Sequence, residues 1–211
     1  SIEAIDNAVL ERQPLWSNRK ADHGPFDIIG DVHGCFDELH TLLTRLGYQL
    51  RAKEGIEVGY ETSHPDGRKA VFLGDLVDRG PKIPEVLRLV MAMTAQGTAL
   101  CVPGNHDVKL MRKLCGRDVK VSHGLAESLA QLAEQPPEFS SRVADFIDGL
   151  VSHYVLDDGK LVVAHAGMKE TMAGRGSAAV REFALYGEST GETDAYGLPV
   201  RVAWAEDYRG R

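Results

Sequence analysis

The sequence predicts an α/β fold with parallel strands, because short apolar runs alternate with segments of helical periodicity. The apolar runs at 26–30, 70–73 and 98–102 each lead into a turn that contains glycine. Strands that are connected through helices are expected to lie parallel, with right-handed crossovers. Ligands of such sheets bind beyond the carboxyl ends of the strands, so the turns after these runs are where a site is expected.

The first half of the chain contains three predicted strand and helix units. Each strand is followed by apolar residues at helical spacing, in the segments 36–46, 86–93 and 108–114. Gly47 is expected to end the first helix, while Pro81 and Pro84 are expected to open the second.

The second half contains two further predicted elements. Residues 116–152 are expected to be mostly helical, with two apolar stripes separated by Pro136 and Pro137. Tyr154–Leu156 and Leu161–Ala164 flank an Asp-Gly pair and predict a β-hairpin. From Met168 onward, glycine and charge rise and the periodicity falls, so the pattern predicts little.

Two connecting segments complete the chain. Residues 1–24 are expected to form a helix followed by a linker, and residues 54–69 a hairpin or a long loop. The remainder, 25–211, is expected to be one domain, because 211 residues suffice for a sizeable core.

Composition excludes several functional classes. A net charge of −7 argues against a broad basic surface for nucleic acid, although bound metals and a few arginines could still receive one phosphate end. Cys35, Cys101 and Cys115 form no paired spacing, which argues against a disulfide framework or a zinc knuckle and favours a reducing compartment. No apolar run approaches the ~20 residues needed to span a bilayer, and no signal segment is seen. We therefore expect a cytoplasmic protein that does not associate with a membrane.

Four segments combine glycine with Asp, Asn or His directly after an apolar run: Gly30–Gly34, Gly74–Gly80, Gly104–Asp107 and His165–Gly167. Carboxylate, imidazole and amide oxygen ligands suit Mn, Fe, Ni or Zn. Two such ions about 3.5–4 Å apart clamp phosphoryl oxygens and lower the pKa of a bridging water. One such segment is common in ordinary turns, but four in this order predict a two-metal site that cleaves phosphoesters.

Five residues are the expected metal ligands. Asp31 and His33 are expected to reach one ion. Asp75 is expected to bridge to a second ion, which Asn105 and His165 complete.

Three neighbouring residues are expected to act on the substrate. Arg79 offers a planar fork for two phosphate oxygens. His106 is the expected general acid, and Asp78 is expected to hold its imidazole in the required tautomer.

The four motifs together resemble a known family. Their order, Gly-Asp-x-His-Gly, Gly-Asp-x-Val-Asp-Arg-Gly, Gly-Asn-His-Asp and His-Ala-Gly, resembles the phosphoprotein-phosphatase branch of the calcineurin-like metallophosphoesterases. Residues 14–211 resemble more closely the phosphatase domain of the bacterial polynucleotide kinase-phosphatase, through the segments 24–29, 121–125 and 180–210.

The resemblance implies a more detailed fold. It implies two stacked mixed β-sheets flanked by helices, with residues 116–152 as a helical cap over the metal site. It also implies that Arg209, in the segment 204–210, is a second arginine that grips phosphate. The family pattern continues with one more metal-binding histidine, which this sequence does not contain. We therefore expect the domain to be incomplete at its C-terminus, with its last strands missing, a weaker second metal site and impaired catalysis.

The resemblance also implies a function, which is removal of phosphate from RNA 3′ ends. The expected activities are 2′,3′-cyclic phosphodiesterase and 2′/3′-phosphomonoesterase, within an RNA-repair chain that carries flanking kinase and ligase domains. The expected cofactors are two divalent metal ions, with Mn first and Ni, Fe or Zn as alternatives. Two enzymes with the same motifs are alternatives, a protein serine/threonine phosphatase and a diadenosine tetraphosphatase. An alternative of another class is a catalytically impaired binding or scaffold fragment.

Overall fold

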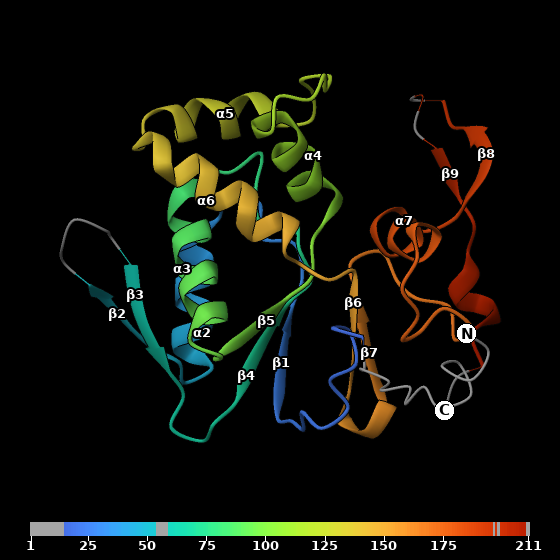
Figure 1. Cartoon of the computed structure of the whole chain (residues 1–211), viewed down its shortest axis with the longest axis horizontal. Helices are drawn as coiled ribbons and strands as arrows, with labels where there is room; N and C mark the ends of the chain where they lie inside the picture. Colours follow the sequence, from blue (N-terminus) through green and yellow to red (C-terminus); the bar gives the residue numbers. More distant parts are fainter. Residues whose placement is uncertain (1–14, 54–58, 196, 198, 210–211) are drawn as a thin grey trace, which may run out of the picture.

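A parallel sheet of three strands forms the centre of the molecule, in the order β1-β4-β5 (Figure 1). The computed structural model describes residues 15–53, 59–195, 197 and 199–209. The strands are β1 (Phe26–Ile29), β4 (Lys69–Phe72) and β5 (Ala99–Cys101). All three were predicted from their apolar runs, and the predicted parallel pairing is confirmed.

Helices cover one face of this sheet (Figure 1). Leu43, Phe72 and Leu87 are fully buried there, which accounts for the apolar spacing of the helical segments. The described helices on this side are α2 (Phe36–Arg45), α3 (Ile83–Ala95), α4 (Asn105–Leu114), α5 (Leu125–Ala133) and α6 (Pro137–Asp148).

A second sheet packs on the other face of the central sheet. Strands β6 (His153–Leu156) and β7 (Leu161–Ala164) form the predicted antiparallel hairpin, and the 3₁₀ turn η1 (Asp157–Gly159) connects them. Val71 and Leu100 of the central sheet share a buried cluster with residues of both hairpin strands. The predicted α/β class with two stacked sheets is therefore confirmed. The three described strands of the first sheet pair in parallel and the two strands of the hairpin pair antiparallel, while Asn18 makes an isolated parallel bridge to Val155 of β6.

Helix α7 (Ala178–Tyr186) covers the outer side of the hairpin, so helices lie outside both sheets. The sequence pattern did not predict this helix. Its signals are short ones, namely a cap in which Ser177 accepts a hydrogen bond from the backbone N–H of Val180, and a small buried stripe.

Two small hairpins complete the described structure. Strands β2 (Gln49–Lys53) and β3 (Gly59–Ser63) form one of them, which begins earlier than the predicted segment 54–69. Strands β8 (Ser189–Thr193) and β9 (Pro199–Arg201) form the other, and the 3₁₀ turn η2 (Trp204–Asp207) follows. The N-terminal part of the predicted helix and linker, residues 1–14, lies outside the described residues. None of the helices that the structure describes has both the length and the apolar character needed to cross a membrane.

Candidate active site

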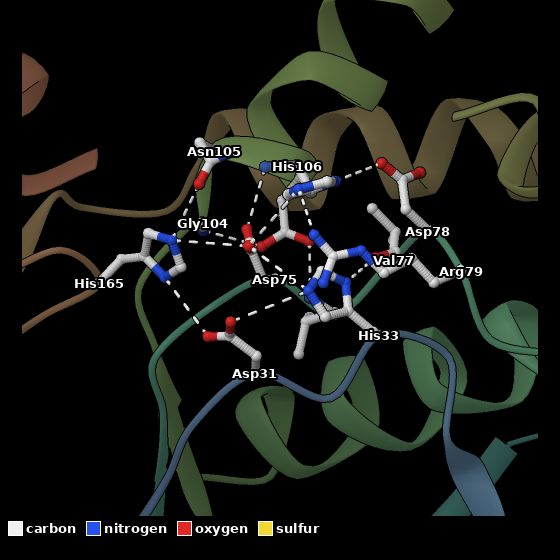
Figure 2. Close-up of polar contacts among 12 residues, drawn as sticks. Asp31, His33, Asp75, Val77, Asp78, Arg79, Gly104, Asn105, His106 and His165 are labelled. Carbon is white, nitrogen blue, oxygen red and sulfur yellow. Dashed lines mark hydrogen bonds and ion pairs between the residues drawn. The ribbon is translucent and has the colours of Figure 1, made fainter. Parts of the chain in front are cut away.

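The turns that follow β1, β4, β5 and β7 meet at one edge of the stacked sheets (Figure 2). They bring together all five predicted metal ligands and the predicted acid group, which lie far apart in the sequence. The residues are Asp31 and His33 after β1, Asp75, Asp78 and Arg79 after β4, Asn105 and His106 after β5, and His165 after β7.

Glycines allow the turns after β4 and β5 to touch. Gly74 has φ +88°, and a Cβ placed there would lie 2.1 Å from the backbone nitrogen of Gly104. A Cβ at Gly104 would lie 2.0 Å from Oδ1 of Asp75. No side chain fits at either position, so these two motif glycines are required for close approach of the backbone.

Asp75 lies at the centre of the site. Its side chain is almost fully buried, and its Oδ1 accepts a hydrogen bond from the backbone N–H of His106 at 3.0 Å. Its Oδ2 is 3.6 Å from Nε2 of His165, 3.8 Å from Nε2 of His33 and 4.0 Å from Nε2 of His106. Three imidazoles therefore face one buried carboxylate at distances longer than hydrogen bonds.

Backbone carbonyls fix the tautomers of two of these histidines. Nδ1 of His33 lies 2.7 Å from the carbonyl oxygen of Val77, and Nδ1 of His165 lies 2.8 Å from that of Leu73. A carbonyl oxygen can only accept, so each Nδ1 carries the ring proton and donates it. The Nε2 lone pair of each ring then faces Asp75, which is the arrangement found at metal-binding histidines.

The donor set fits metal ions. Nε2 of His33 is buried and has no hydrogen-bond partner among the described residues, as expected for a nitrogen that binds a cation. Two groups of side chains have ligand atoms within 4.8 Å of one another: Asp31, Asp75 and His165, and His33, Asp75 and His106. Asp75 belongs to both groups, which fits the bridging position expected for it.

Asn105 lies beside the group that contains His165. Its Oδ1 is 3.0 Å from Nε2 of His165, and with the ring proton on Nδ1 both atoms are acceptors. A cation bound to both atoms would stabilise this arrangement, so Asn105 also fits a metal site.

His106 and Asp78 form a buried pair. Nδ1 of His106 donates to Oδ2 of Asp78 at 2.5 Å, and Asp78 is fully buried (Figure 2). This hydrogen bond raises the pKa of His106, against the opposing effect of burial. Nε2 of His106 is left to face Asp75 and Nη2 of Arg79, which is 3.4 Å away. The pair has the arrangement of a general acid and its orienting carboxylate.

Two residues that support this centre were not singled out from the sequence. Asp107 is buried and accepts hydrogen bonds from the backbone N–H groups of Leu76 at 2.9 Å and Gly104 at 2.8 Å, and burial raises its pKa to about 7. Ser128 of α5 contacts Asp78. Asp107 had a sequence signal, since it ends the Gly104–Asp107 motif and is an acidic residue directly before the predicted helical segment 108–114. Ser128 had none.

Arg209 is not brought to the site in the same way. Its side chain is exposed, and its guanidinium donates to the backbone carbonyls of Glu206 and Tyr208. Its expected role in gripping phosphate stays a prediction.

A cavity of about 260 Å³ opens beside two of the predicted metal ligands. Asn105 and His165 line one side of it, and Tyr186, Arg201 and Trp204 contribute to the other. Figure 1 shows α7 next to the β6–β7 hairpin, after which His165 follows, with the β8–β9 hairpin on the far side of α7.

Comparison with known proteins places this geometry in a family. The model of the calcineurin-like phosphoesterase family matches residues 24–192. The chain is 45% identical over 189 residues to a protein of Halalkalibacterium halodurans that is named bis(5′-nucleosyl)-tetraphosphatase PrpE [asymmetrical]; the match covers 88% of this chain and 74% of that protein. The protein of the same name from Bacillus subtilis is 43% identical over 190 residues, covering 88% and 75%.

A solved structure supports the fold. The crystal structure of a candidate diadenosine tetraphosphatase matches with a TM-score of 0.57 and 24% identity, covering 94% of this chain and 73% of that one. Family model, relatives and site geometry agree: the chain belongs to the calcineurin-like phosphoesterase family and is a metal-dependent phosphoester hydrolase.

Proposed function

We propose that this chain hydrolyses dinucleoside 5′-tetraphosphates asymmetrically, into one nucleoside monophosphate and one nucleoside triphosphate. The observation that carries the proposal is the similarity, at 45% identity over 88% of the chain, to a relative named for that activity. This was an alternative expected from the motifs. The sequence first suggested RNA 3′-end activity with flanking kinase and ligase domains. The relatives described above bear the tetraphosphatase name and do not support that activity, so it stays a prediction.

The site residues supply the parts that such a hydrolysis needs. Asp31, His33, Asp75, Asn105 and His165 would hold two divalent metal ions, for which we propose manganese. These ions would supply positive charge to the phosphoryl oxygens and lower the pKa of the attacking water. The polyphosphate of the substrate is negatively charged, and the protein itself carries a net charge of −7. The bound metal ions would therefore supply the local positive charge that attracts the substrate.

The remaining groups act directly on the substrate. The oxygen of water bonds to one phosphorus atom while the bond from that phosphorus to the bridging oxygen breaks. Arg79 binds nonbridging oxygens of the phosphoryl group under attack. His106 gives the proton on Nε2 to the departing oxygen, and Asp78 holds the ring through Nδ1 throughout.

The cavity beside the metal ligands is the proposed position of one nucleoside. It is lined by Tyr186 and Trp204, whose aromatic rings are suitable for stacking on a base. Arg201 is fixed by a hydrogen bond to the backbone carbonyl of Tyr186, which orders the rim of the cavity.

A substrate panel tests the proposed function. Diadenosine tetraphosphate, an RNA oligonucleotide ending in a 2′,3′-cyclic phosphate and a phosphoserine peptide would each be incubated with the protein and Mn²⁺, and kcat/KM compared. We expect the dinucleotide to have the highest value and to yield AMP and ATP in equal amounts. Two molecules of ADP would contradict the asymmetrical cleavage. A higher kcat/KM for the RNA end would overturn the proposal in favour of RNA repair.

A matched variant ties the activity to the site. Asp75→Asn removes one charge from the central carboxylate at nearly constant volume, so turnover of the dinucleotide should be lost. Turnover that persists in this variant would show that a contaminating hydrolase is being measured.

A further inference from the structure

Helix α5 contacts the turn that carries Asp78 and Arg79 with one of its faces. Gly124, Ser128 and Gln131 are spaced by four and three residues, which places them on the same side of the helix. All three meet the turn between Asp78 and Ile83, which joins β4 to α3. Glu127 of the same helix does not contact this turn and is exposed.

Ser128 fixes Asp78 at two points. Its hydroxyl is fully buried and accepts a hydrogen bond from the backbone N–H of Asp78 at 2.9 Å. The same hydroxyl donates its proton to Oδ1 of Asp78. The other carboxylate oxygen, Oδ2, holds Nδ1 of His106. One serine hydroxyl therefore sets both the backbone and the side-chain orientation of the residue that orients the imidazole.

Gln131 and Gly124 hold the rest of the turn. Nε2 of Gln131 donates to the carbonyl of Gly80 at 2.9 Å, and its Oε1 accepts from the backbone N–H of Ile83 at 2.8 Å. Gly124 packs so closely that a Cβ there would lie 2.7 Å from the backbone nitrogen of Arg79. The amide and the close packing thus fix the two ends of the turn against one helix.

The turn needs this support because its backbone is strained. Asp78 has φ +71° and Arg79 has φ +69°, in the left-handed region that non-glycine residues rarely adopt. Such residues persist only where surrounding contacts determine their conformation. The contacts that do so here come largely from α5.

We propose that α5 is a positioning element for the general acid, in which Ser128 orients Asp78 and, through it, the imidazole of His106. Ser128 touches neither the reacting atoms nor a metal ligand, so it is a positioning residue. The helix lies in the segment 116–152, whose expected role as a cap over the site stays a prediction; the proposed role of α5 is to hold the turn that carries Asp78. The inference rests on the role proposed above for His106.

The test compares two esters that differ only in their leaving group. Phenyl phosphate needs protonation of its leaving oxygen more than nitrophenyl phosphate does, so loss of the acid slows the first ester selectively. Ser128→Ala should lower kcat for phenyl phosphate about 10- to 30-fold and for nitrophenyl phosphate less than about 3-fold, with KM changed by less than about twofold. His106→Asn should show the same selectivity, with a larger loss.

Three further variants make the result specific to the hydroxyl and its face of the helix. Ser128→Thr keeps the hydroxyl and should restore kcat for phenyl phosphate to within about 3-fold of the wild-type value. Gln131→Glu keeps the acceptor for Ile83 but loses the donor to Gly80, so it should show a weaker selective loss. Glu127→Ala changes an exposed neighbour on the same helix and should leave both kcat values unchanged.

Each alternative outcome overturns a defined part of the inference. If Ser128→Ala slows both esters equally, or neither, while His106→Asn is selective, α5 does not position the acid. If Ser128→Ala does not fold, the selectivity of Gln131→Glu decides in the same way. If His106→Asn slows both esters equally, the acid role itself fails. None of these outcomes depends on the tetraphosphatase proposal, which the substrate panel judges separately.

Discussion

Asp75 is the residue on which the site depends most. It is nearly fully buried, and the three imidazole nitrogens that face its Oδ2 are each 3.6–4.0 Å away. Burial of a carboxylate without compensating positive charge is costly. Divalent cations bound between Asp75 and the imidazoles of His33 and His165 would supply that charge.

Asp75→Asn should therefore abolish metal binding at both positions. The amide keeps the volume of the side chain but loses the charge and one acceptor oxygen. We expect fewer than one Mn²⁺ per chain and a fall in kcat of at least about 100-fold. Metal analysis after equilibrium dialysis measures the stoichiometry. Asp31→Asn is the variant for comparison. Asp31 is half-exposed and belongs to one ligand group only, so this variant should weaken metal binding at one position and not at both. Two ions retained by Asp75→Asn would contradict the bridging role.

Tyr186 is the residue that tests the proposed nucleoside position. Tyr186 lines the cavity beside Asn105 and His165 and is partly exposed. Base stacking on an aromatic ring contributes about 1–3 kcal/mol. Tyr186→Leu should therefore raise KM for diadenosine tetraphosphate by about 5- to 20-fold and leave KM for nitrophenyl phosphate within about twofold. Tyr186→Phe should retain the wild-type KM. An equal rise for both substrates would mean that the ring shapes the metal site, not a nucleoside pocket.

At this scale, sequence predicted the residues proposed to carry the chemistry, and Asp78 as the partner of His106, but not the other groups that orient them. The proposed metal ligands and the proposed acid lie in short glycine-flanked motifs. Such motifs are recognisable because the chemistry restricts the residue type at each position. The orienting partners are set by tertiary contacts. Val77 and Leu73 fix the tautomers through carbonyls that any residue would supply, 44 and 92 positions from their histidines. Ser128 is 50 positions from Asp78 in an ordinary amphipathic helix.

Among the elements, strands and helices that bury a continuous apolar stripe were predictable. Val71 faces the second sheet while Ala70 and Phe72 face the helices, so β4 is apolar from Ala70 to Phe72. Helix α7 was missed for the opposite reason. It is short and follows a glycine-rich segment, and three of its buried residues, Phe183, Ala184 and Leu185, are consecutive. Its periodicity is therefore weak, and its cap at Ser177 is local evidence only.

The junction between β6 and the segment before α7 is expected to be sensitive to acid. His153 is buried, its Nε2 accepts a hydrogen bond from the backbone N–H of Gly174 at 2.8 Å, and its Nδ1 lies 2.9 Å from Oγ of Ser152. Burial lowers the pKa of His153 below its usual value. The unfolded chain therefore binds a proton near pH 6.5 that the folded protein still excludes.

The direction of the pH dependence of stability follows from this difference in the pKa of His153 between the folded and unfolded states. The unfolded state binds more protons below the unfolded pKa of about 6.5, so the free energy of unfolding falls as pH decreases through that value, by at most about 1.4 kcal/mol per pH unit. Urea unfolding between pH 7.5 and 5 measures it. His153→Gln should flatten this dependence. His23→Gln is the control, because hydrogen bonding to Asp157 raises the pKa of the exposed His23 and its contribution has the opposite sign. An unchanged slope in His153→Gln would refute the assignment.

Over the whole molecule, the site joins the two sheets. Four of the five proposed metal ligands follow strands of the central sheet, and His165 follows β7 of the hairpin. The alternation of strands and helices predicted the central sheet, and the Asp-Gly pair predicted the hairpin. Their stacking came from the family resemblance, because no local pattern records which face of β4 meets which strand. The buried cluster shared by Val71, Leu100 and Val163 supplies that contact.

Because the proposed ligands come from both sheets, metal binding should stabilise the whole fold. A ligand that binds only the folded state at 100 times its Kd adds about 2.7 kcal/mol. For a chain of this size each kcal/mol raises Tm by about 2–4 °C, so saturating Mn²⁺ should raise Tm by about 5–10 °C, and a chelator should reverse the rise. Calorimetry with and without metal measures this.

His165→Ala removes the one proposed ligand from the hairpin and should reduce that rise by about half or more, while the metal-free Tm stays close to the wild-type value. His64→Ala is the matched control, since His64 lies in the turn after β3 and packs against Tyr48, away from the metal ligands. A full rise in His165→Ala would mean that the ions are held by the central sheet alone. In that case the hairpin would contribute to the substrate cavity but not to the metal centre.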